Sequence, residues 1–435
     1  MTSASPQRYS LMEAGKFTLS LALSQSTALM SPLIIQSSGI AEYGRIEVAL
    51  AFASITSIVL SLGLHQLVGV RYIKQRNDLK PLVETTMLYL FCLLAAAMLF
   101  TLLGANRFVS QLLGETSTRD LVAIFAFATL VYFKHLTLSI AAMNYRVNLY
   151  LALELFSALS YAAIVVAGFA SGSVDLVTIM FANVASVVPN VLVVTVFTWR
   201  KRVEVASKIR AYLGSGWAAS TRETLHTSMP LMVIGLLAAV GGAVDRLLLS
   251  HYDITPADIG VYSLAFRLVS LAPLAIQYLI GNIHSREVYR ALSMDVAEQG
   301  SGLLHAIRKN ARLAVFAFAI MLAIFGAGYY ALDIILPLVY GLNAASFPWY
   351  FVLATAFSLS LASSFLTPIL IYTERTGALL TASMLGVVGF AVVNFTMIPT
   401  WGVWASAMAF LLLHLLRLIY LAITCRRIYR ETIWI

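Results

Sequence analysis

Two neighbouring stretches, WYFVLATAFSLSLASSFLTPILIY (349–372) and GALLTASMLGVVGFAVVNFTMI (377–398), decide the fold of this chain. Neither contains an Asp, Glu, Lys or Arg, and only the residues TERT separate them. An α-helix needs about 20 apolar residues to cross the hydrocarbon core of a bilayer, and both stretches are long enough. The sequence here predicts two antiparallel transmembrane helices joined by a tight turn.

The rest of the 435-residue chain has the same character. It is 60% apolar and 11% charged, whereas soluble domains are about 45–50% apolar and about 25% charged. A soluble chain of this length would need more charge to cover its surface. The composition therefore excludes a soluble enzyme, a secreted disulfide scaffold and a disordered regulator. It predicts an all-α polytopic membrane protein, because helices satisfy their own backbone hydrogen bonds in lipid.

Twelve segments are apolar enough to span a membrane. We predict helices at 17–37, 46–69, 82–103, 120–142, 149–170, 175–198, 225–251, 260–282, 313–332, 349–372, 377–398 and 401–424. The apolar block ALDIILPLVYG after Tyr330 contains Asp333 and Pro337, and we interpret it as an extracytoplasmic extension. We expect no cleaved signal peptide, because the first apolar block is itself long enough to span.

The basic residues give the orientation. The alternation of the twelve spans places 22 of the Lys and Arg residues on one side and three, Arg45, Arg107 and Arg119, on the other. Positively charged loops remain in the cytoplasm, so both termini are predicted to be cytoplasmic. The net charge of +9 has the same origin and does not indicate a nucleic-acid partner.

An internal repeat divides the chain into halves. The longest basic connection, WRKRVEVASKIRAYLGSGW, separates six spans from six, and Ala41-Glu-Tyr-Gly44 before ALAFASI matches Ala257-Asp-Ile-Gly260 before SLAFRLVSL. We therefore predict two six-helix lobes, 1–210 and 211–435, related by a pseudo-two-fold axis along the membrane normal. Chance similarity in a biased composition is the alternative explanation.

Sequence motifs for catalysis or ATP hydrolysis are not found. Gly15-Lys16-Phe17 lacks the upstream glycine and the Ser/Thr of a P-loop, and no zinc-protease or hydrolase signature occurs. The two cysteines, Cys92 and Cys425, form no metal or redox motif. We expect neither an enzyme nor a cofactor or metal site, and any transport would draw on an ion gradient or on the gradient of the substrate.

Ionisable residues inside spans are the candidate functional residues, because each is costly in lipid unless it faces a partner or a cavity. We identify Lys134, Glu154, Asp245, Arg246, Arg267 and Arg417, with His135 and His414 nearby. Similar depth in the membrane predicts the ion pairs Lys134–Glu154 and Asp245–Arg267. These pairs could simply join helices, and Arg417 could snorkel to the cytoplasmic surface. By this count four basic residues face two acidic ones, which favours an anionic substrate.

The segment VDRLLLSHYDITPADIGVYSLAFRLVSLAPLAI (244–276) resembles the seventh and eighth spans of polysaccharide flippases, and SPLIIQSSGIAEYGRIEVALAFASI (31–55) is similar to their first two. These flippases belong to the multidrug/oligosaccharidyl-lipid/polysaccharide exporter superfamily. The resemblance covers essentially the whole chain and implies a MATE-like fold of two six-helix lobes. Its motifs are loose, and only Asp245 and Arg267 fall on positions with a recognisable pattern.

The resemblance implies a Wzx-type flippase of the bacterial inner membrane. Such a protein moves an undecaprenyl-diphosphate-linked oligosaccharide between leaflets by alternating access, for O-antigen or exopolysaccharide synthesis, in a pathway that includes a polymerase and a chain-length regulator. In this reading Arg246 and Arg267 near the outer side, and Lys134 and Arg417 near the inner side, bind the diphosphate. Glu154 or Asp245 would carry a coupling proton.

Three alternatives remain open at this point. An ion-coupled drug or metabolite exporter of the same superfamily would need acidic residues in its cavity. A lipid II-type flippase would be essential for growth, and such relatives often have additional spans. An integral membrane polymerase or ligase would usually have a large extracytoplasmic loop, whereas the outer connections predicted here are short.

Overall fold

The computed structural model describes residues 26–64, 80–102, 118–143, 147–172, 174–214, 217–279, 301–373 and 375–433, with a few isolated residues between them. Within these ranges the chain is helical and contains no strand. The helices of the N-terminal half are α2 (Ser26–Ser61), α4 (Lys80–Leu102), α6 (Thr118–Met143), α7 (Val147–Ala170), α8 (Leu176–Arg200) and α9 (Arg202–Gly214). Those of the C-terminal half are α10 (Trp217–Ala239), the π-helix η1 (Val240–Val244), α11 (Asp245–His251), α12 (Pro256–Leu279), α14 (Ser301–Tyr340), the 3₁₀-helix η4 (Ala344–Ser346), α15 (Tyr350–Tyr372), α16 (Thr376–Trp401) and α17 (Val403–Ile433).

Nine helices in the described ranges are long and apolar enough to cross a membrane. They confirm the all-α membrane class, while the number twelve stays a prediction. One of the nine, α2, covers parts of the first two predicted spans. Of the predicted spans outside the nine, the third corresponds to α4, and the seventh to α10, η1 and α11 together. The terminal residues of some predicted spans, such as 280–282 of the eighth, lie outside the described residues.

The chain folds as two compact units. Unit 2 consists of Ser26–Leu264 and Asn394–Ser406, and unit 1 contains Ala265–Val393 and Ala407–Ile435. Helices α12, α16 and α17 therefore each begin in one unit and end in the other. The two units are defined by the contacts between residues and not by the sequence repeat. The two six-helix lobes, 1–210 and 211–435, therefore stay a prediction.

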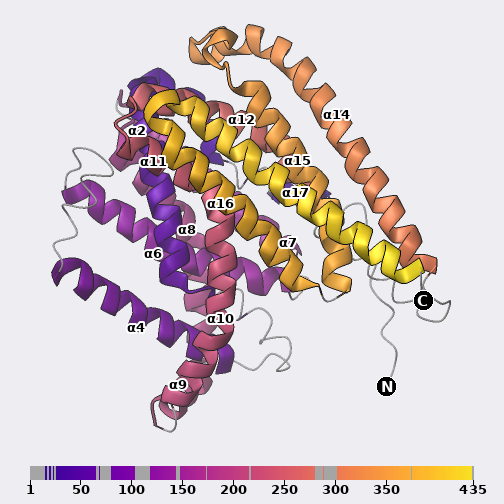
Figure 1. The fold of residues 1–435 in the computed structure, drawn as a ribbon. Coiled ribbons are helices and arrows are strands. Elements are labelled where there is room, and N and C mark those ends of the chain that lie inside the picture. The colour runs from indigo at the N-terminus through magenta and orange to yellow at the C-terminus, as the bar shows by residue number, and fades with distance from the viewer. Residues whose placement is uncertain are drawn as a thin grey trace. The chain divides into compact units, whose positions relative to one another are not determined.

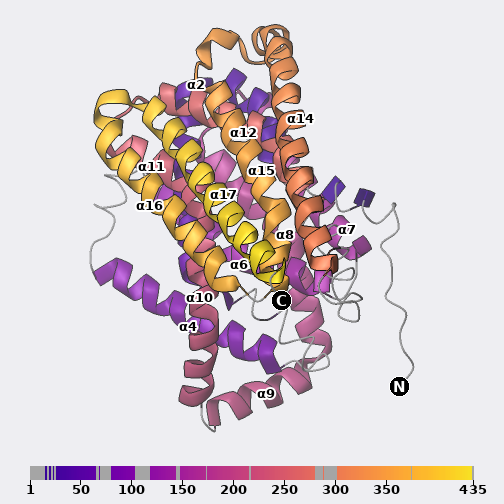
Figure 2. The same ribbon diagram turned by 45° about the vertical axis from the view of Figure 1, so that its right-hand side comes forward.

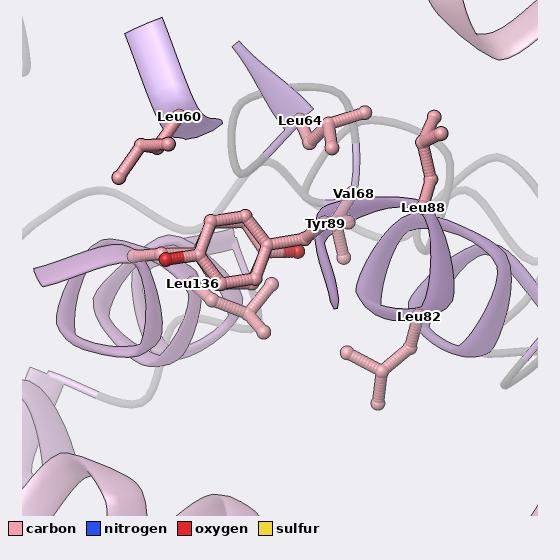
Figure 3. Packing of buried hydrophobic residues seen from close by; sticks show 8 residues of the cluster. Leu60, Leu64, Val68, Leu82, Leu88, Tyr89 and Leu136 are labelled. Atoms are coloured by element: carbon pink, nitrogen blue, oxygen red, sulfur yellow. The ribbon is translucent and has the colours of Figure 1, made fainter. Parts of the chain in front are cut away.

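Apolar side chains of α2, α4 and α6 form a core within unit 2. Leu60, Leu82 and Leu136 pack around Tyr89, which is fully buried (Figure 3). The ring of Tyr89 stacks on that of Tyr132 with centroids 3.8 Å apart, and its hydroxyl donates a hydrogen bond to the carbonyl of Thr129 at 2.6 Å. This bond satisfies the phenol in a surrounding that offers no water.

In unit 1, α14 lies along α15 (Figures 1 and 2), and residues from four helices form the core near the C-terminal end of α17. Ile307, Ile369, Ala382 and Leu421 are examples from α14, α15, α16 and α17. Helix α14 continues without interruption to Tyr340. The apolar block after Tyr330, predicted as an extension outside the membrane, is thus a continuation of the same helix.

Helix α2 is broken at Gly39, where φ is +82° and ψ is 166°. Glycine adopts this conformation without the steric cost that a Cβ would bring. The hydroxyl of the preceding residue, Ser38, donates a hydrogen bond to the carbonyl of Val174, just before α8. The break marks the connection expected between the first and second predicted spans.

The second part of α2 crosses the start of α12 at two glycines, both in unit 2. A Cβ on Gly44 would fall on the carbonyl oxygen of Pro256 and within 2.9 Å of the backbone nitrogen of Gly260. A Cβ on Gly260 would fall on the carbonyl oxygen of Ile40 and within 3.2 Å of the nitrogen of Gly44. These are the two glycines that the predicted internal repeat aligns, and each blocked carbonyl belongs to the residue four positions before the opposite glycine.

Asp175 caps the N-terminus of α8. Its Oδ1 accepts hydrogen bonds from the backbone amide of Thr178 at 2.8 Å and from the Thr178 hydroxyl at 2.6 Å. Partial burial raises the pKa of the Asp175 carboxyl, but the hydrogen bonds from Thr178, supported by the charge of Arg119, outweigh it. The net pKa therefore lies below its ordinary value.

Asp175→Ala should weaken the first turn of α8 by about 0.5–2 kcal/mol. Because the folded pKa is depressed, the contribution of the carboxylate is complete above the pKa of the unfolded chain and is lost as pH falls through the folded value. Hydrogen exchange of the first-turn amides measured against pH tests this. Asp175→Ser is the control, since it keeps a capping oxygen but does not titrate. Equal pH dependence in the serine variant would contradict the prediction.

Candidate functional site

The predicted ion pair between Lys134 on α6 and Glu154 on α7 is confirmed. Lys134 Nζ lies 3.2 Å from Glu154 Oε2. The carboxylate is 3% exposed and the ammonium side chain 20% exposed. Glu154 Oε2 accepts no hydrogen bond in this geometry, so the contact is a Coulombic attraction alone. The pair joins α6 to α7, and Lys134 is the more accessible of the two partners.

Polar groups of three helices surround this pair in unit 2. Ser157, one turn after Glu154, accepts a hydrogen bond from Asn190 Nδ2 on α8 at 3.2 Å. The hydroxyl of Thr137, one turn after Lys134, donates to the carbonyl of Phe133 at 2.7 Å. Asn190 is fully buried and its Oδ1 accepts no hydrogen bond. Buried polar groups in a membrane helix bundle are costly, so this cluster is a strong candidate for function.

A second buried cluster surrounds Arg246 at the start of α11. Its Nε donates to Ser263 Oγ on α12 at 3.0 Å and lies 3.6 Å from Glu47 Oε2 on α2. Its Nη1 lies 3.3 Å from Oδ1 of the neighbouring Asp245. The side chains of Glu47, Asp245 and Arg246 are at most 4% exposed. The guanidinium thus joins three helices.

Two further groups complete the Arg246 cluster. The hydroxyl of Tyr262 donates to the other carboxylate oxygen of Asp245 at 2.6 Å, and Arg246 Nη1 donates to the carbonyl of Gly242. In the structure Asp245 is thus bonded to Arg246 and Tyr262. The sequence instead predicts a pair between Asp245 and Arg267. Arg267 belongs to the other unit, so the Asp245–Arg267 pair would join the units and stays a prediction. Arg246 is buried among protein groups, and diphosphate binding by it also stays a prediction.

The helix that carries Arg246 is irregular. The π-helix Val240–Val244 interrupts the seventh predicted span between α10 and α11 and contains Gly241 and Gly242. Single π-helical turns within α-helices often occur at functional sites. The wider turn gives Gly242 a carbonyl that Arg246 binds. The sequence predicts one uninterrupted helix over 225–251, because this stretch is predominantly apolar and the glycine pair does not by itself indicate a π-turn.

Arg417 on α17 differs from the other three basic candidates. It is partly buried in unit 1, its Nε has no hydrogen-bond partner, and it forms no ion pair with any residue of the described ranges. His414, one turn before it, is 8% exposed and packs edge-on against Phe410 at 4.6 Å. A guanidinium whose Nε lacks an acceptor in an apolar bundle suits an oxyanion such as a phosphate group.

The count of two acidic residues in the spans is wrong. Glu47 and Glu84 also lie within predicted spans, and the structure buries both of them together with Glu154 and Asp245. Glu47 could have been found from the repeat, since it follows Gly44 by three residues just as Ser263 follows Gly260. The surplus of positive charge therefore no longer supports an anionic substrate. That argument now depends on which basic groups lack partners.

An apolar groove of about 580 Å³ runs between α7 and α8. Leu153, Phe156, Pro189 and Leu192 are among the residues that form it. Exposed apolar groups such as Phe156 and Leu192 are expected where a helix faces lipid. The described ranges contain no group of three or more His, Cys, Asp or Glu residues arranged to hold a metal ion.

Comparison with solved structures gives close agreement in fold at low sequence identity. The lipid II flippase MurJ in an inward closed conformation aligns over 96% of this chain and 88% of its own, with 14% identity and a TM-score of 0.68. An inward-facing MATE multidrug resistance transporter of the MOP superfamily aligns over 95% of both chains, with 13% identity and a TM-score of 0.66. A MATE transporter in a bent conformation aligns over 97% of this chain and 95% of its own, with 12% identity and a TM-score of 0.57.

No family model matches the sequence, and none of the curated proteins matches it. The likeness is therefore one of fold: the described ranges contain nine helices long and apolar enough to cross a membrane, and the alignments cover nearly the whole chain. This chain is an all-α, multi-pass membrane protein with the fold shared by the MurJ flippase and the MATE transporters.

Proposed function

We propose that this protein is a flippase that translocates an undecaprenyl-diphosphate-linked oligosaccharide across the bacterial inner membrane by alternating access. The product would enter O-antigen or exopolysaccharide synthesis, with a polymerase and a chain-length regulator as partners in the pathway. The likeness of the fold to a lipid II flippase over nearly the whole chain supports translocation of a lipid-linked substrate.

The observation that carries the proposal is the unpartnered guanidinium of Arg417. An arginine in a membrane helix is normally paired, because an isolated charge in lipid is costly. Arg417 has no ion-pair partner in the described ranges, and its Nε has no acceptor. A diphosphate would supply that acceptor and the opposite charge. Lys134, which is 20% exposed, would provide a second basic contact by exchanging Glu154 for a phosphate oxygen.

A cation-coupled exporter of the same fold is the second candidate. The buried carboxylates of Glu47, Glu84, Glu154 and Asp245 favour it, because acidic groups in the membrane are typical of proton and cation pathways. Three of these carboxylates already face basic partners: Glu154 lies beside Lys134, and Glu47 and Asp245 lie beside Arg246. We therefore rank this function below the flippase.

A deletion strain tests the proposal directly. Its isoprenoid-linked lipids and surface glycans would be analysed by mass spectrometry, with the restored gene as control. We expect a diphosphate-linked oligosaccharide to accumulate while a surface polymer disappears. Accumulation of lipid II with arrested growth would identify a peptidoglycan flippase instead. Unchanged lipids and glycans, together with new drug sensitivity, would favour the exporter.

Arg417→Gln should reduce translocation strongly without loss of folded protein. A charge-assisted hydrogen bond contributes about 1.5–3 kcal/mol, so affinity for the diphosphate should fall roughly tenfold or more. The ratio of accumulated lipid-linked sugar to surface polymer measures the effect in cells. Arg427→Gln on the same helix is the matched control, since Arg427 is 76% exposed and bonds Glu431. Equal export by both variants would contradict the assignment of Arg417.

A further inference from the structure

The two repeats meet at a crossing that is symmetric in its contacts. Gly44 on α2 and Gly260 on α12 are equivalent positions of the repeat, and each lies against the carbonyl of the residue four positions before the other. Glycines of this kind let two membrane helices approach until the backbones touch. At the two glycines the helices therefore touch through backbone atoms.

Arg246 binds the next equivalent positions on both helices. Glu47 follows Gly44 by three residues and Ser263 follows Gly260 by three, and Arg246 Nε lies 3.6 Å from the first and 3.0 Å from the second. The guanidinium therefore fastens α2 and α12 together one turn beyond the glycines. Two of its other partners, Asp245 and the carbonyl of Gly242, lie on its own helix or the adjoining π-turn and would stay with it if α2 and α12 separated.

The energetics of this arrangement suit a reversible contact. A buried ion pair gains Coulomb energy but loses the hydration of both charges, so its net contribution is small compared with the hydrated, separated groups. Opening the crossing towards water would rehydrate Glu47 and Arg246 and offset the broken contact. Asp245 would continue to neutralise Arg246. The closed and open arrangements can then be close in free energy, as a switching element requires.

We propose that Gly44, Gly260, Glu47 and Arg246 form a latch, which closes the ends of α2 and α12 against each other and opens once in each transport cycle. In the orientation predicted from the basic residues, these ends lie on the extracytoplasmic side. The proposal rests on alternating access in the proposed function, and it assigns the closing contact to particular residues. It does not depend on which molecule is transported.

Accessibility of a buried cysteine tests whether the latch opens. Cys92 and Cys425 would be replaced by alanine and Ile259, which precedes Gly260 and is 2% exposed, by cysteine. A membrane-impermeant maleimide would be applied to intact cells and to inverted vesicles, so that labelling from either side is detected. Ala128→Cys on α6, which is 1% exposed and belongs to neither crossing helix, is the control for burial.

We expect Ile259→Cys to react and Ala128→Cys to remain unreacted. Ile46→Cys, fully buried on α2, provides a second probe should the first variant fold poorly. Glu47→Gln should increase the labelling rate of either probe several-fold, because it removes the fastening charge. If both probes are as unreactive as Ala128→Cys from both sides in exporting cells, the contact is permanent and the latch is overturned.

Cross-linking distinguishes failure of the latch from failure of the proposed function. Cysteines at Glu47 and Ser263 would be bridged by a short bifunctional methanethiosulfonate reagent that a reductant can remove. We expect reagent-dependent and reversible loss of transport of the molecule found in the deletion strain, whether it is a lipid-linked sugar or a drug. Single-cysteine variants treated in the same way are the control. Undiminished transport by fully cross-linked protein would refute the latch while leaving the substrate unaffected.

Discussion

Alanine at Gly44 or at Gly260 is expected to destabilise the closed protein, and the two substitutions together are expected to cost little more than one. Either Cβ would overlap a carbonyl oxygen of the opposite helix, so the backbones must move apart. Overpacking of a close contact costs about 1–3 kcal/mol. Once the first alanine has separated the helices, the second finds space already made, and the two effects are not additive.

Thermal unfolding in detergent would measure these effects as a double-mutant cycle. Gly377→Ala on α16 and Gly326→Ala on α14 are matched controls, because a Cβ at either position meets no atom within 4 Å. Both controls should be neutral or slightly stabilising, since alanine favours helix more than glycine does. Two independent and additive losses would show that Gly44 and Gly260 do not share one contact.

Most of the fold follows from the apolar blocks of the sequence, because length and hydrophobicity alone determine which segments can be membrane helices. The predicted segments 120–142, 149–170 and 349–372 agree with α6, α7 and α15. The π-turn before Asp245 could not be predicted, since it depends on how one helix packs against its neighbours. The continuation of α14 through Pro337 was missed because a proline and an aspartate favour the end of a helix.

An ion pair could be predicted only where the depth of the two residues along their helices was enough to identify the partners. Lys134 and Glu154 lie at the same depth on consecutive helices, and they form the predicted pair. Depth alone gives no rotation about the helix axis, so it could not show that Arg246 faces Glu47 and Ser263. The repeat contained this information, because Glu47 and Ser263 occupy equivalent positions, and Arg246 lies between them.

The corrected charge count changes the basis of the functional argument. With four buried acidic residues in the helices, total charge does not distinguish a flippase from a cation-coupled exporter. What distinguishes them is whether a basic residue is left with unused donors. Arg417 has such donors, whereas Arg246 is surrounded by acceptors. Lys134 has one acidic partner but is partly exposed, so it is intermediate between Arg417 and Arg246. Substitutions of Lys134 can therefore test its role in stability and its role in transport separately.

Replacing Lys134 by methionine should destabilise the protein severely, by about 3–5 kcal/mol, because Glu154 would remain as a buried charge without a partner. The reversed pair, Lys134→Glu with Glu154→Lys, should restore most of that stability, since the attraction does not depend on which helix carries which charge. Glu154→Gln alone should cost less, because Lys134 is the more exposed partner and can reach water. Thermal unfolding of the purified variants measures all three effects.

Export by the reversed pair shows what Lys134 does beyond holding helices together. To exchange Glu154 for a phosphate oxygen, the lysine must present its ammonium group from the partly exposed position 134 on α6. In the reversed pair the lysine is at position 154 on α7, which is buried, and it could not reach the phosphate. We therefore expect the reversed pair to be stable but inactive in export, with the lipid-linked sugar accumulating as in the deletion strain. Recovery of both stability and export would show that the pair only joins α6 to α7. Binding of the diphosphate would then have to depend on basic groups outside this pair.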